Sequence, residues 1–417
     1  MLNSVSNMAS ITIRRAVRIA ETLAGPPEGW HLEQREPSTS AIVVRCAEPP
    51  VVFAEPIAVA MLGAWATYQR TLGREIIIDP TLQSPSAFRS GLLSALAGRT
   101  TGGAANSRFF RLVTEQEAQD KLPDYVEAML KSAPEAEQIA LYCLSDLIQN
   151  VFDHARTNGA GAFCAIAFDK RTSRVRLAVA DCGQGIPATI KPHYEGDLDN
   201  QNSLLLALEP ELSGNSARDG VNRGVGLYFV RRLALAASGG FCAVTEELSA
   251  RASAHSPSDF VPRIVALPHR WQGTAVAVTF KAIGAEYSGP MQAIKDEIEG
   301  RGPRYADIRF FKKSANAPDW QRVKIDSDNG KFAMDRGRAT ALAQDQILPL
   351  LRLGAKVELD FTGVAKATQA FCHALIVPLL RSGGANVLGR LQFVGCSPRT
   401  RSPICFAVNY ASTTDDA

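Results

Sequence analysis

The sequence predicts an α/β protein in which a central α/β sandwich is flanked by two smaller α/β domains. Short apolar runs alternate with segments of helical periodicity along most of the chain, which is the pattern of α/β folds. At 417 residues, the chain is also too long for one ordinary core. Glycine- and proline-rich breaks help to divide it. We expect domains at residues 1–130, 131–285 and 300–417.

The composition indicates a folded protein with no strong charge bias. Apolar residues make up 46% and charged residues 21%, and the net charge is 45 − 42 = +3. This small excess argues against nucleic-acid binding driven by charge alone, and the basic residues Lys312, Lys313, Arg399 and Arg401 are too dispersed to define a groove. Nucleic acid is therefore not an expected partner.

Cysteine spacing and hydropathy indicate a cytoplasmic protein. The eight cysteines are scattered, without the paired spacing of a zinc site or the density of a disulfide framework, which fits a reducing compartment. The longest apolar stretch, Ile57–Ala66, is too short to span a bilayer. We expect no membrane anchor.

Elements of the first domain follow from periodicity and breakers. Strands are predicted at Ala41–Arg45, at Val51–Phe53 and, as a buried strand, at Glu75–Asp79. Helices are predicted at Ile11–Ala24, Ala58–Thr71 and Ser84–Ala97. Residues 99–106, rich in glycine and alanine, are expected to be the loop that leaves this domain.

The second and third domains show the same alternation. In the second, we expect a helix over Ala133–Ala155, strands near 161–168 and 175–180, a helix over Tyr228–Ala237 and a closing strand over Thr274–Phe280. In the third, we expect a helix over Asp335–Leu353, a strand over Lys356–Phe361, a helix over Gln369–Arg381 and a strand over Leu391–Val394. The first and third domains share an order that is consistent with distant versions of one fold.

Two polar residues stand out on the first helix of the middle domain. Asp146 and Asn150 are four residues apart and therefore share one face, while Leu144, Leu147, Ile148 and Val151 form the opposite apolar stripe. A carboxylate and an amide oxygen suit a hard cation such as Mg²⁺. A solvated helix face explains the same pair equally simply.

Three further motifs follow in order. Asp181 ends a strand and precedes Gly183, Gly185 and Ile186, where a carboxylate and a flexible backbone can receive an exocyclic amine such as that of adenine. The run Arg223, Gly224, Val225, Gly226 and Leu227 opens a helix and can present backbone N–H groups to phosphate. Thr274 begins the closing strand. Singly, these motifs are also explained as turns, a tight loop and a β-former.

In this order and spacing, the motifs resemble the N box, G1 box, G2 box and final Gly-Thr of the GHKL superfamily of gyrase, heat-shock chaperone, histidine kinase and MutL ATPases. The resemblance covers about residues 135–282 and implies a mixed sheet covered on one side by helices. It implies that Asn150 ligates Mg²⁺, Asp181 binds the adenine amino group, Gly183 and Gly185 shape the adenine pocket, Gly224 and Gly226 approach the phosphates, and Thr274 supports Asp181.

The resemblance also implies an ATP lid, and the sequence departs from the family pattern at one position, Asp146. Residues Glu195–Arg223 resemble the lid, and we expect this segment to be mobile because little of it can form a core of its own. The family usually has Glu at the position of Asp146, where it acts as general base. Aspartate places its carboxylate about 1 Å further back, and such a displacement can lower the rate roughly 10²-fold. His154 nearby is interpreted as a structural residue.

The third domain resembles the STAS-like domain of unknown function found behind bacterial GHKL modules and, more distantly, anti-sigma factor antagonists. In those antagonists a regulatory Ser begins the helix that corresponds to Gln369–Arg381. Here Gln369 or Ala370 occupies that position and only Thr368 offers a nearby hydroxyl, so a phosphorylation switch is not expected. Adjacent Cys372 and His373 do not face one site on a helix, which favours packing. The first domain is interpreted as STAS-like by its similar order.

These features favour an Mg-ATP-driven conformational switch that signals to a protein partner in bacterial regulation or defence, with ATP and Mg²⁺ as cofactors. An anti-sigma-type serine/threonine protein kinase is one alternative. A non-catalytic ATP-binding scaffold is another, because of Asp146. The chain is also a candidate homo-oligomer.

Overall fold

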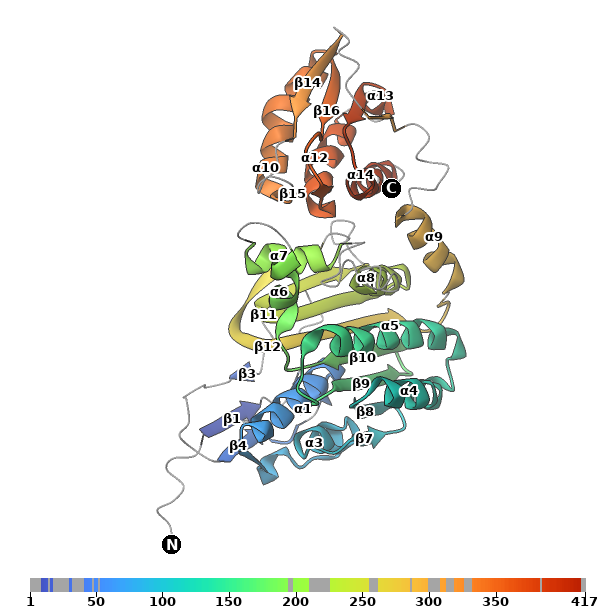
Figure 1. Cartoon of the computed structure of the whole chain (residues 1–417). Coiled ribbons are helices and arrows are strands. Elements are labelled where there is room, and N and C mark those ends of the chain that lie inside the picture. Colours follow the sequence, from blue (N-terminus) through green and yellow to red (C-terminus); the bar gives the residue numbers. More distant parts are fainter. Residues whose placement is uncertain are drawn as a thin grey trace. The chain divides into compact units, whose positions relative to one another are not determined.

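The computed structural model separates into two compact units (Figure 1). The first unit comprises residues 1–193 and 226–287, and the second comprises residues 194–225 and 288–417. Each is described by itself. The structure describes residues 9–13, 16–17, 30–31, 41–46, 49–51, 53–193, 198–209, 226–254, 262–285, 287–298, 308–312, 319–325, 332–382 and 385–413.

The first unit is built on a six-stranded sheet in the order β11-β12-β10-β9-β8-β7, with all neighbours antiparallel. Its strands are β7 (Thr101–Ala104), β8 (Ser107–Leu112), β9 (Ala162–Asp169), β10 (Arg174–Ala180), β11 (Gly240–Ser253) and β12 (Arg263–Lys281). Its larger helices are α1 (Pro56–Thr71), α4 (Glu115–Leu130), α5 (Glu137–Asn150) and α8 (Gly226–Ala236). Short helices are α2 (Pro85–Arg89), α3 (Leu92–Leu96) and α6 (Gly185–Ile190).

Helices cover both faces of this sheet (Figure 1). Side chains alternate along β10, so that Val175, Leu177 and Val179 face α5 and its neighbours, whereas Ala178 and Ala180 join the core around α1. The face toward α1 consists largely of small residues, which lets this helix lie close to the strands. The family resemblance implies helices on one side only, so α1 is an addition to that plan.

Helix α1 explains why the N-terminal segment is not a separate compact unit. The helix is apolar on all sides, and 13 of its 16 residues are buried. Its core also includes Ile42 and Val44 of β4 (Ala41–Cys46) in a smaller sheet, with the order β3-β1-β4-β6. That sheet contains β1 (Ala9–Ile13), β3 (Trp30–His31) and β6 (Glu75–Ile78), while β2 (Ala16–Val17) pairs with β5 (Phe53–Ala54).

Because α1 is buried between the two sheets, the expected boundary at residue 130 does not divide the units, and β7 and β8 belong to the central sheet. Several N-terminal elements also differ from expectation. The predicted helix Ile11–Ala24 is wrong, since β1 and β2 occupy its described part. The predicted helix Ser84–Ala97 is broken at Gly91, which has a φ of 82°. The predicted loop at 99–106 contains β7, and β6 is half-exposed instead of buried.

The second unit contains a four-stranded parallel sheet in the order β13-β18-β16-β14. Its strands are β13 (Phe310–Phe311), β14 (Trp320–Lys324), β16 (Lys356–Asp360) and β18 (Leu391–Val394), and β15 (Phe332–Ala333) pairs with β17 (Lys366–Ala367). Its helices are α7 (Asn200–Ala207), α9 (Ser288–Ile298), α10 (Arg336–Ala341), a π-helical turn (Leu342–Ile347), α11 (Leu348–Arg352), α12 (Gln369–Arg381), α13 (Ala385–Leu388) and α14 (Pro398–Thr413). The predicted elements over 335–394 are confirmed, while β13, β14 and α14 were not predicted.

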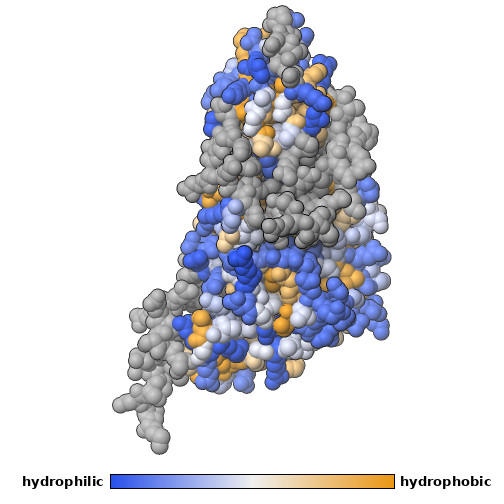
Figure 2. Space-filling model, viewed as in Figure 1, coloured by the Kyte–Doolittle hydropathy of each residue, from blue (hydrophilic) through white to orange (hydrophobic). Residues whose placement is uncertain are grey.

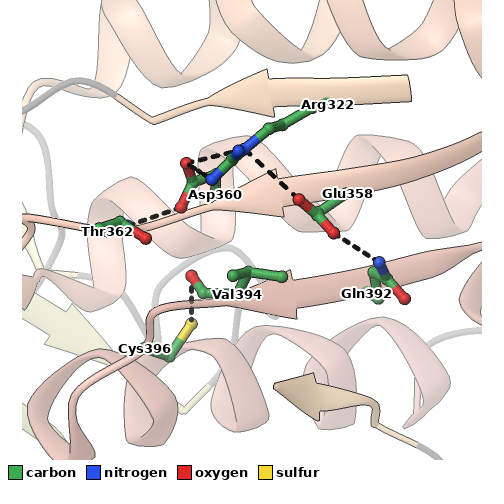
Figure 3. Close-up of polar contacts among 7 residues, drawn as sticks. All are labelled: Arg322, Glu358, Asp360, Thr362, Gln392, Val394 and Cys396. Atoms are coloured by element: carbon green, nitrogen blue, oxygen red, sulfur yellow. Dashed lines mark hydrogen bonds and ion pairs between the residues drawn. The ribbon is translucent and has the colours of Figure 1, made fainter. Parts of the chain in front are cut away.

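A row of polar side chains crosses the parallel sheet (Figure 3). On β16, Asp360 accepts a hydrogen bond of 3.0 Å from Nε of Arg322, and Glu358 accepts one of 2.6 Å from Nε2 of Gln392. Burial favours a raised pKa for Asp360, but hydrogen bonds from Thr362 and the ion pair with Arg322 hold this pKa below its ordinary value. The row therefore fixes the register of three neighbouring strands.

The surface carries no continuous apolar face in the view of Figure 2, where hydrophobic residues form small, separate patches among hydrophilic ones. The described large apolar residues that are most exposed, Ile283 and Leu353, belong to different units. Among the described helices, none is long and apolar enough to cross a membrane.

The small-residue face under α1 makes a stability prediction. Ala165 is 2% exposed on β9 beneath the helix, whereas Ala167 lies two residues along the same face and is half-buried. We expect Ala165→Leu to lower the free energy of unfolding of the first unit by about 1–3 kcal/mol, because the added atoms separate helix and sheet. Ala167→Leu is the matched control. Urea unfolding followed by the fluorescence of Trp65 and Trp271 measures both, and equal effects would contradict this account.

Candidate functional site

The site is centred on Asp181, which follows β10 and is 3% exposed. Its Oδ1 accepts hydrogen bonds from the backbone N–H of Gly183 at 2.8 Å and of Thr274 at 3.3 Å. The Asp181 N–H in turn donates to the Thr274 carbonyl at 2.8 Å. Burial raises the pKa of Asp181 to about 6, although these two hydrogen bonds favour the ionised form. The carboxylate is thus held in one orientation, but its two hydrogen bonds do not fully replace those it would make to water.

Glycines surround this carboxylate because no side chain fits there. A Cβ built on Gly183 would lie 1.9 Å from the Ala155 carbonyl oxygen, and one on Gly273 would lie 2.7 Å from Oδ1 of Asp181. Gly185 and Gly273 also have φ angles of 77° and 97°, which disfavour other residues. Close packing thus requires glycine at Gly183 and Gly185, and Gly273 of β12 packs against the same carboxylate.

Thr245 on β11 is a site residue that the sequence analysis missed. Its hydroxyl donates to the Gly273 carbonyl at 3.0 Å and accepts from the N–H of Ile186 at 3.1 Å. It therefore ties the turn after Asp181 to Gly273 in the middle of β12, a strand that begins at Arg263 and not, as expected, at Thr274. No local motif marks this threonine, and its strand was not predicted.

The end of α5 packs against the same turn. After Asn150 the helix widens into a π-helical turn over Val151–Ala155, a form often found at functional sites. The Ala155 carbonyl accepts from the N–H of Gln184 at 2.8 Å, and the His154 carbonyl accepts from Nε2 of Gln184 at 2.8 Å. Through its backbone, His154 thus supports the turn.

Asp146 and Asn150 lie together on α5, as their spacing predicts. Nδ2 of Asn150 donates to Oδ2 of Asp146 at 3.3 Å. In this orientation, the amide oxygen of Asn150, a hard ligand, points away from Asp146. Burial raises the pKa of Asp146 to about 6, and the charge of Asp153 adds to this, while the hydrogen bond from Asn150 opposes it. Asp146 therefore changes protonation near neutral pH.

Helix α8 begins directly against Asp146. A Cβ built on Gly226 would lie 2.2 Å from Oδ2 of Asp146, so any other residue here would displace this carboxylate. Leu227 follows in the first turn of α8 and is half-buried. The predicted residues Arg223, Gly224 and Val225 lie outside the described residues, as do 195–197 and 210–223 of the expected lid.

The described part of the lid corrects one expectation. We expected little of this segment to form a core of its own, yet α7 buries Ser203, Leu204 and Leu206, and Leu208 and Glu209 directly after it are buried as well. The run forms a short helix, whose N-terminus is capped by Asp199.

The arrangement fits an adenine nucleotide with a divalent cation. The oriented Asp181 carboxylate lies in a turn where glycines allow close backbone packing, and Asp146, hydrogen-bonded to Asn150, lies beside the glycine that opens α8. The donor set is carboxylate and amide oxygen, which suits Mg²⁺. Among the described residues, no cluster of three or more His, Cys, Asp or Glu could hold a metal ion, so the ligands offered here are Asp146 and Asn150 alone.

Candidates on α12 have structural roles. Thr368 is 1% exposed, and its hydroxyl caps the helix by accepting from the N–H of Phe371 at 3.1 Å. Cys372 is fully buried. Burial, with the charges of Arg336 and Arg381, lowers the pKa of His373 to about 4, so that its imidazole is neutral at pH 7. These contacts agree with the interpretation of Cys372 and His373 as packing residues.

Comparison with known families gives two matches. The histidine kinase-, DNA gyrase B- and HSP90-like ATPase family matches residues 136–281, which include Asp146, Asn150, Asp181, Gly226 and Thr274. A STAS-like domain of unknown function matches residues 342–401. No curated protein gives a significant match to the chain. The chain thus contains a GHKL-type ATP-binding domain followed by a STAS-like domain.

Proposed function

We propose that this protein is an Mg-ATP-dependent conformational switch with slow ATPase activity, which signals to a protein partner in bacterial regulation or defence. The observation that carries the proposal is the buried Asp181 carboxylate, held by two backbone N–H groups in a turn whose close packing requires glycine. A carboxylate in this state favours a further hydrogen-bond donor, and the exocyclic amine of adenine is such a donor.

The cation and the phosphates are assigned to the other side of the site. Asn150 would hold Mg²⁺ through its amide oxygen, since Nδ2 is directed to Asp146. The phosphates would lie at the start of α8, where N–H groups and the positive end of the helix dipole favour anions. Bound Mg²⁺ would neutralise charge on the phosphates. Gly224 and Val225 are assigned to the same cradle by the family motif.

Asp146 is assigned as the general base. Its carboxylate would accept the proton of the attacking water while the water oxygen bonds to the γ-phosphorus and the bond to the β-phosphate oxygen breaks. The start of α8 packs against the Asp146 carboxylate at Gly226. This close approach would partly offset the shorter side chain of Asp compared with the Glu that is usual in the family. A pKa of about 6 leaves Asp146 mainly ionised at pH 7, as a base requires.

The location of α7 supports a signalling role. This helix belongs to the expected lid, yet it groups with the STAS-like part in the second unit. Within that unit, the thiol pKa of Cys372 on α12 is raised by burial and by the nearby carboxylate of Glu209. The lid is thus in electrostatic contact with α12, and closure over ATP would act on that helix.

Substitution of Asp181 tests nucleotide binding. Asn keeps an oxygen for the two backbone N–H groups but replaces the second carboxylate oxygen by a donor. We expect Asp181→Asn to raise the Kd for ATP about 10- to 100-fold, which corresponds to the loss of a charged hydrogen bond of about 1.5–3 kcal/mol. Calorimetric titration measures this, with the exposed Asp120→Asn as control. Unchanged ATP affinity in Asp181→Asn would remove the basis of the proposal.

Substitution of Asp146 tests hydrolysis separately. We expect the Asp146→Asn variant to bind ATP but no longer to hydrolyse it, so that no phosphate is released. Because the raised pKa means that Asp146 gains its proton as the pH falls through about 6, the wild-type rate should drop about tenfold for each pH unit below that value. Phosphate release measured from pH 5 to pH 8 gives this profile. Equal rates for the variant and the wild type would exclude Asp146 as the base.

Limited proteolysis tests the switch. A non-hydrolysable ATP analogue should change the cleavage rate within residues 195–223, and Asp181→Asn should remove this effect. An unchanged rate at saturating nucleotide would contradict lid closure.

Labelled ATP distinguishes the kinase alternative, since only a kinase transfers label to a Ser or Thr of a partner. Binding without turnover in the wild type would instead support a scaffold.

A further inference from the structure

A second cavity lies in the first unit, on the face of the central sheet that α1 covers. Its volume is about 330 Å³, within the range of small-molecule sites. The start of α1 lines one side through Glu55 and Ile57, and residues of β10, β11 and β12 line the rest. Neither the family motifs nor the proposed ATP site uses these residues.

The long hairpin of β11 and β12 creates this cavity. Their pairing shifts register around Glu246, and the second half of β11 folds back over the first. Sγ of Cys242 thus lies 3.5 Å from Oγ of Ser249, and the N–H of Ala254 donates to the Gly239 carbonyl at 2.9 Å. Small residues such as Gly240 and Ala277 keep space open between these layers.

The charged groups of the lining are predominantly cationic. Arg174, Arg176 and Arg251 contribute three guanidinium groups against one carboxylate, that of Glu55. Arg251 and Glu55 are only 3% and 5% exposed. Both act on Cys242, whose thiol pKa is raised chiefly by burial. This net positive charge of the described lining, in a partly apolar and half-open space, favours an anion.

The cavity is separate from the nucleotide site. Arg174 and Arg176 lie at the start of β10, whereas Asp181 follows its end, so the two sites are about 20 Å apart along the strand. They also lie toward opposite faces of the sheet, since Ala277 belongs to the core around α1. One ligand therefore does not account for both.

We propose that this cavity binds a small organic anion, with its acidic group toward Arg174, Arg176 and Arg251 and its apolar body against Ile57 and Ala277. The guanidinium groups supply planar, paired donors that suit a carboxylate, sulfonate or phosphate group. The apolar body distinguishes this ligand from inorganic phosphate. This binding is independent of the proposed ATPase activity.

Two fluorescent probes of the same shape test the role of charge. 8-Anilinonaphthalene-1-sulfonate is anionic, and N-phenyl-1-naphthylamine is its uncharged counterpart. We expect the anionic probe to bind the full-length protein at least tenfold more tightly. The double variant Arg174→Gln, Arg176→Gln should weaken the anionic probe at least tenfold and leave the neutral one unchanged. Arg171→Gln, in the exposed turn before β10, is the matched control and should change neither affinity.

Filling the cavity and protecting its cysteine complete the test. Ala277→Leu should weaken both probes at least tenfold. Because this variant alters the core, alkylation of the wild-type chain gives a second measurement: the anionic probe should slow modification of Cys242 but not of Cys182, which lies beside Asp181. Unchanged anionic affinity in the double arginine variant, or protection of Cys182 instead of Cys242, would overturn the proposal.

Discussion

The burial of one carboxylate organises the candidate site. Asp181 is placed at the end of β10 with two backbone N–H groups on one oxygen, and its pKa of about 6 shows that these bonds do not fully replace water. The surrounding geometry follows from this arrangement. Gly183 and Gly273 must be glycine because the backbone packs closely around the carboxylate. Thr245 links the turn after Asp181 to Gly273 of β12. In the proposed function, the amine of adenine would supply the further hydrogen bond that this carboxylate lacks.

A second constraint is the position of α1. An apolar helix of 16 residues requires cover on all sides, and the small sheet around β4 supplies only part of it. The alanine face of the central sheet supplies the rest, which joins residues 41–96 to the ATP-binding core. In return, α1 covers the face that a helix layer on one side would leave open. The start of this helix also closes one side of the second cavity.

Local patterns predicted most of the motif residues, while long-range pairing limited the prediction of the fold. Asp146 and Asn150 were predicted to lie together because helical spacing alone brings them onto one face. Thr245 was missed because its role depends on β11, whose register is set by pairing with β12 and interrupted at Glu246. The helix predicted at Ile11–Ala24 failed for a similar reason, since β1 forms by pairing with β4. Tertiary pairing overrode local propensity in each case.

Covalent continuity relates the proposed base to the proposed signal. Gly226 ends the segment that begins with the lid, and its contact with Asp146 places the start of α8 beside the reacting phosphate in the proposed mechanism. The other described part of that segment, α7 with Glu209, lies within the second unit near Cys372. Residues 210–225 join these two points along the chain. In the proposed switch, the occupancy of the phosphate site would be communicated to α12 along this covalent connection.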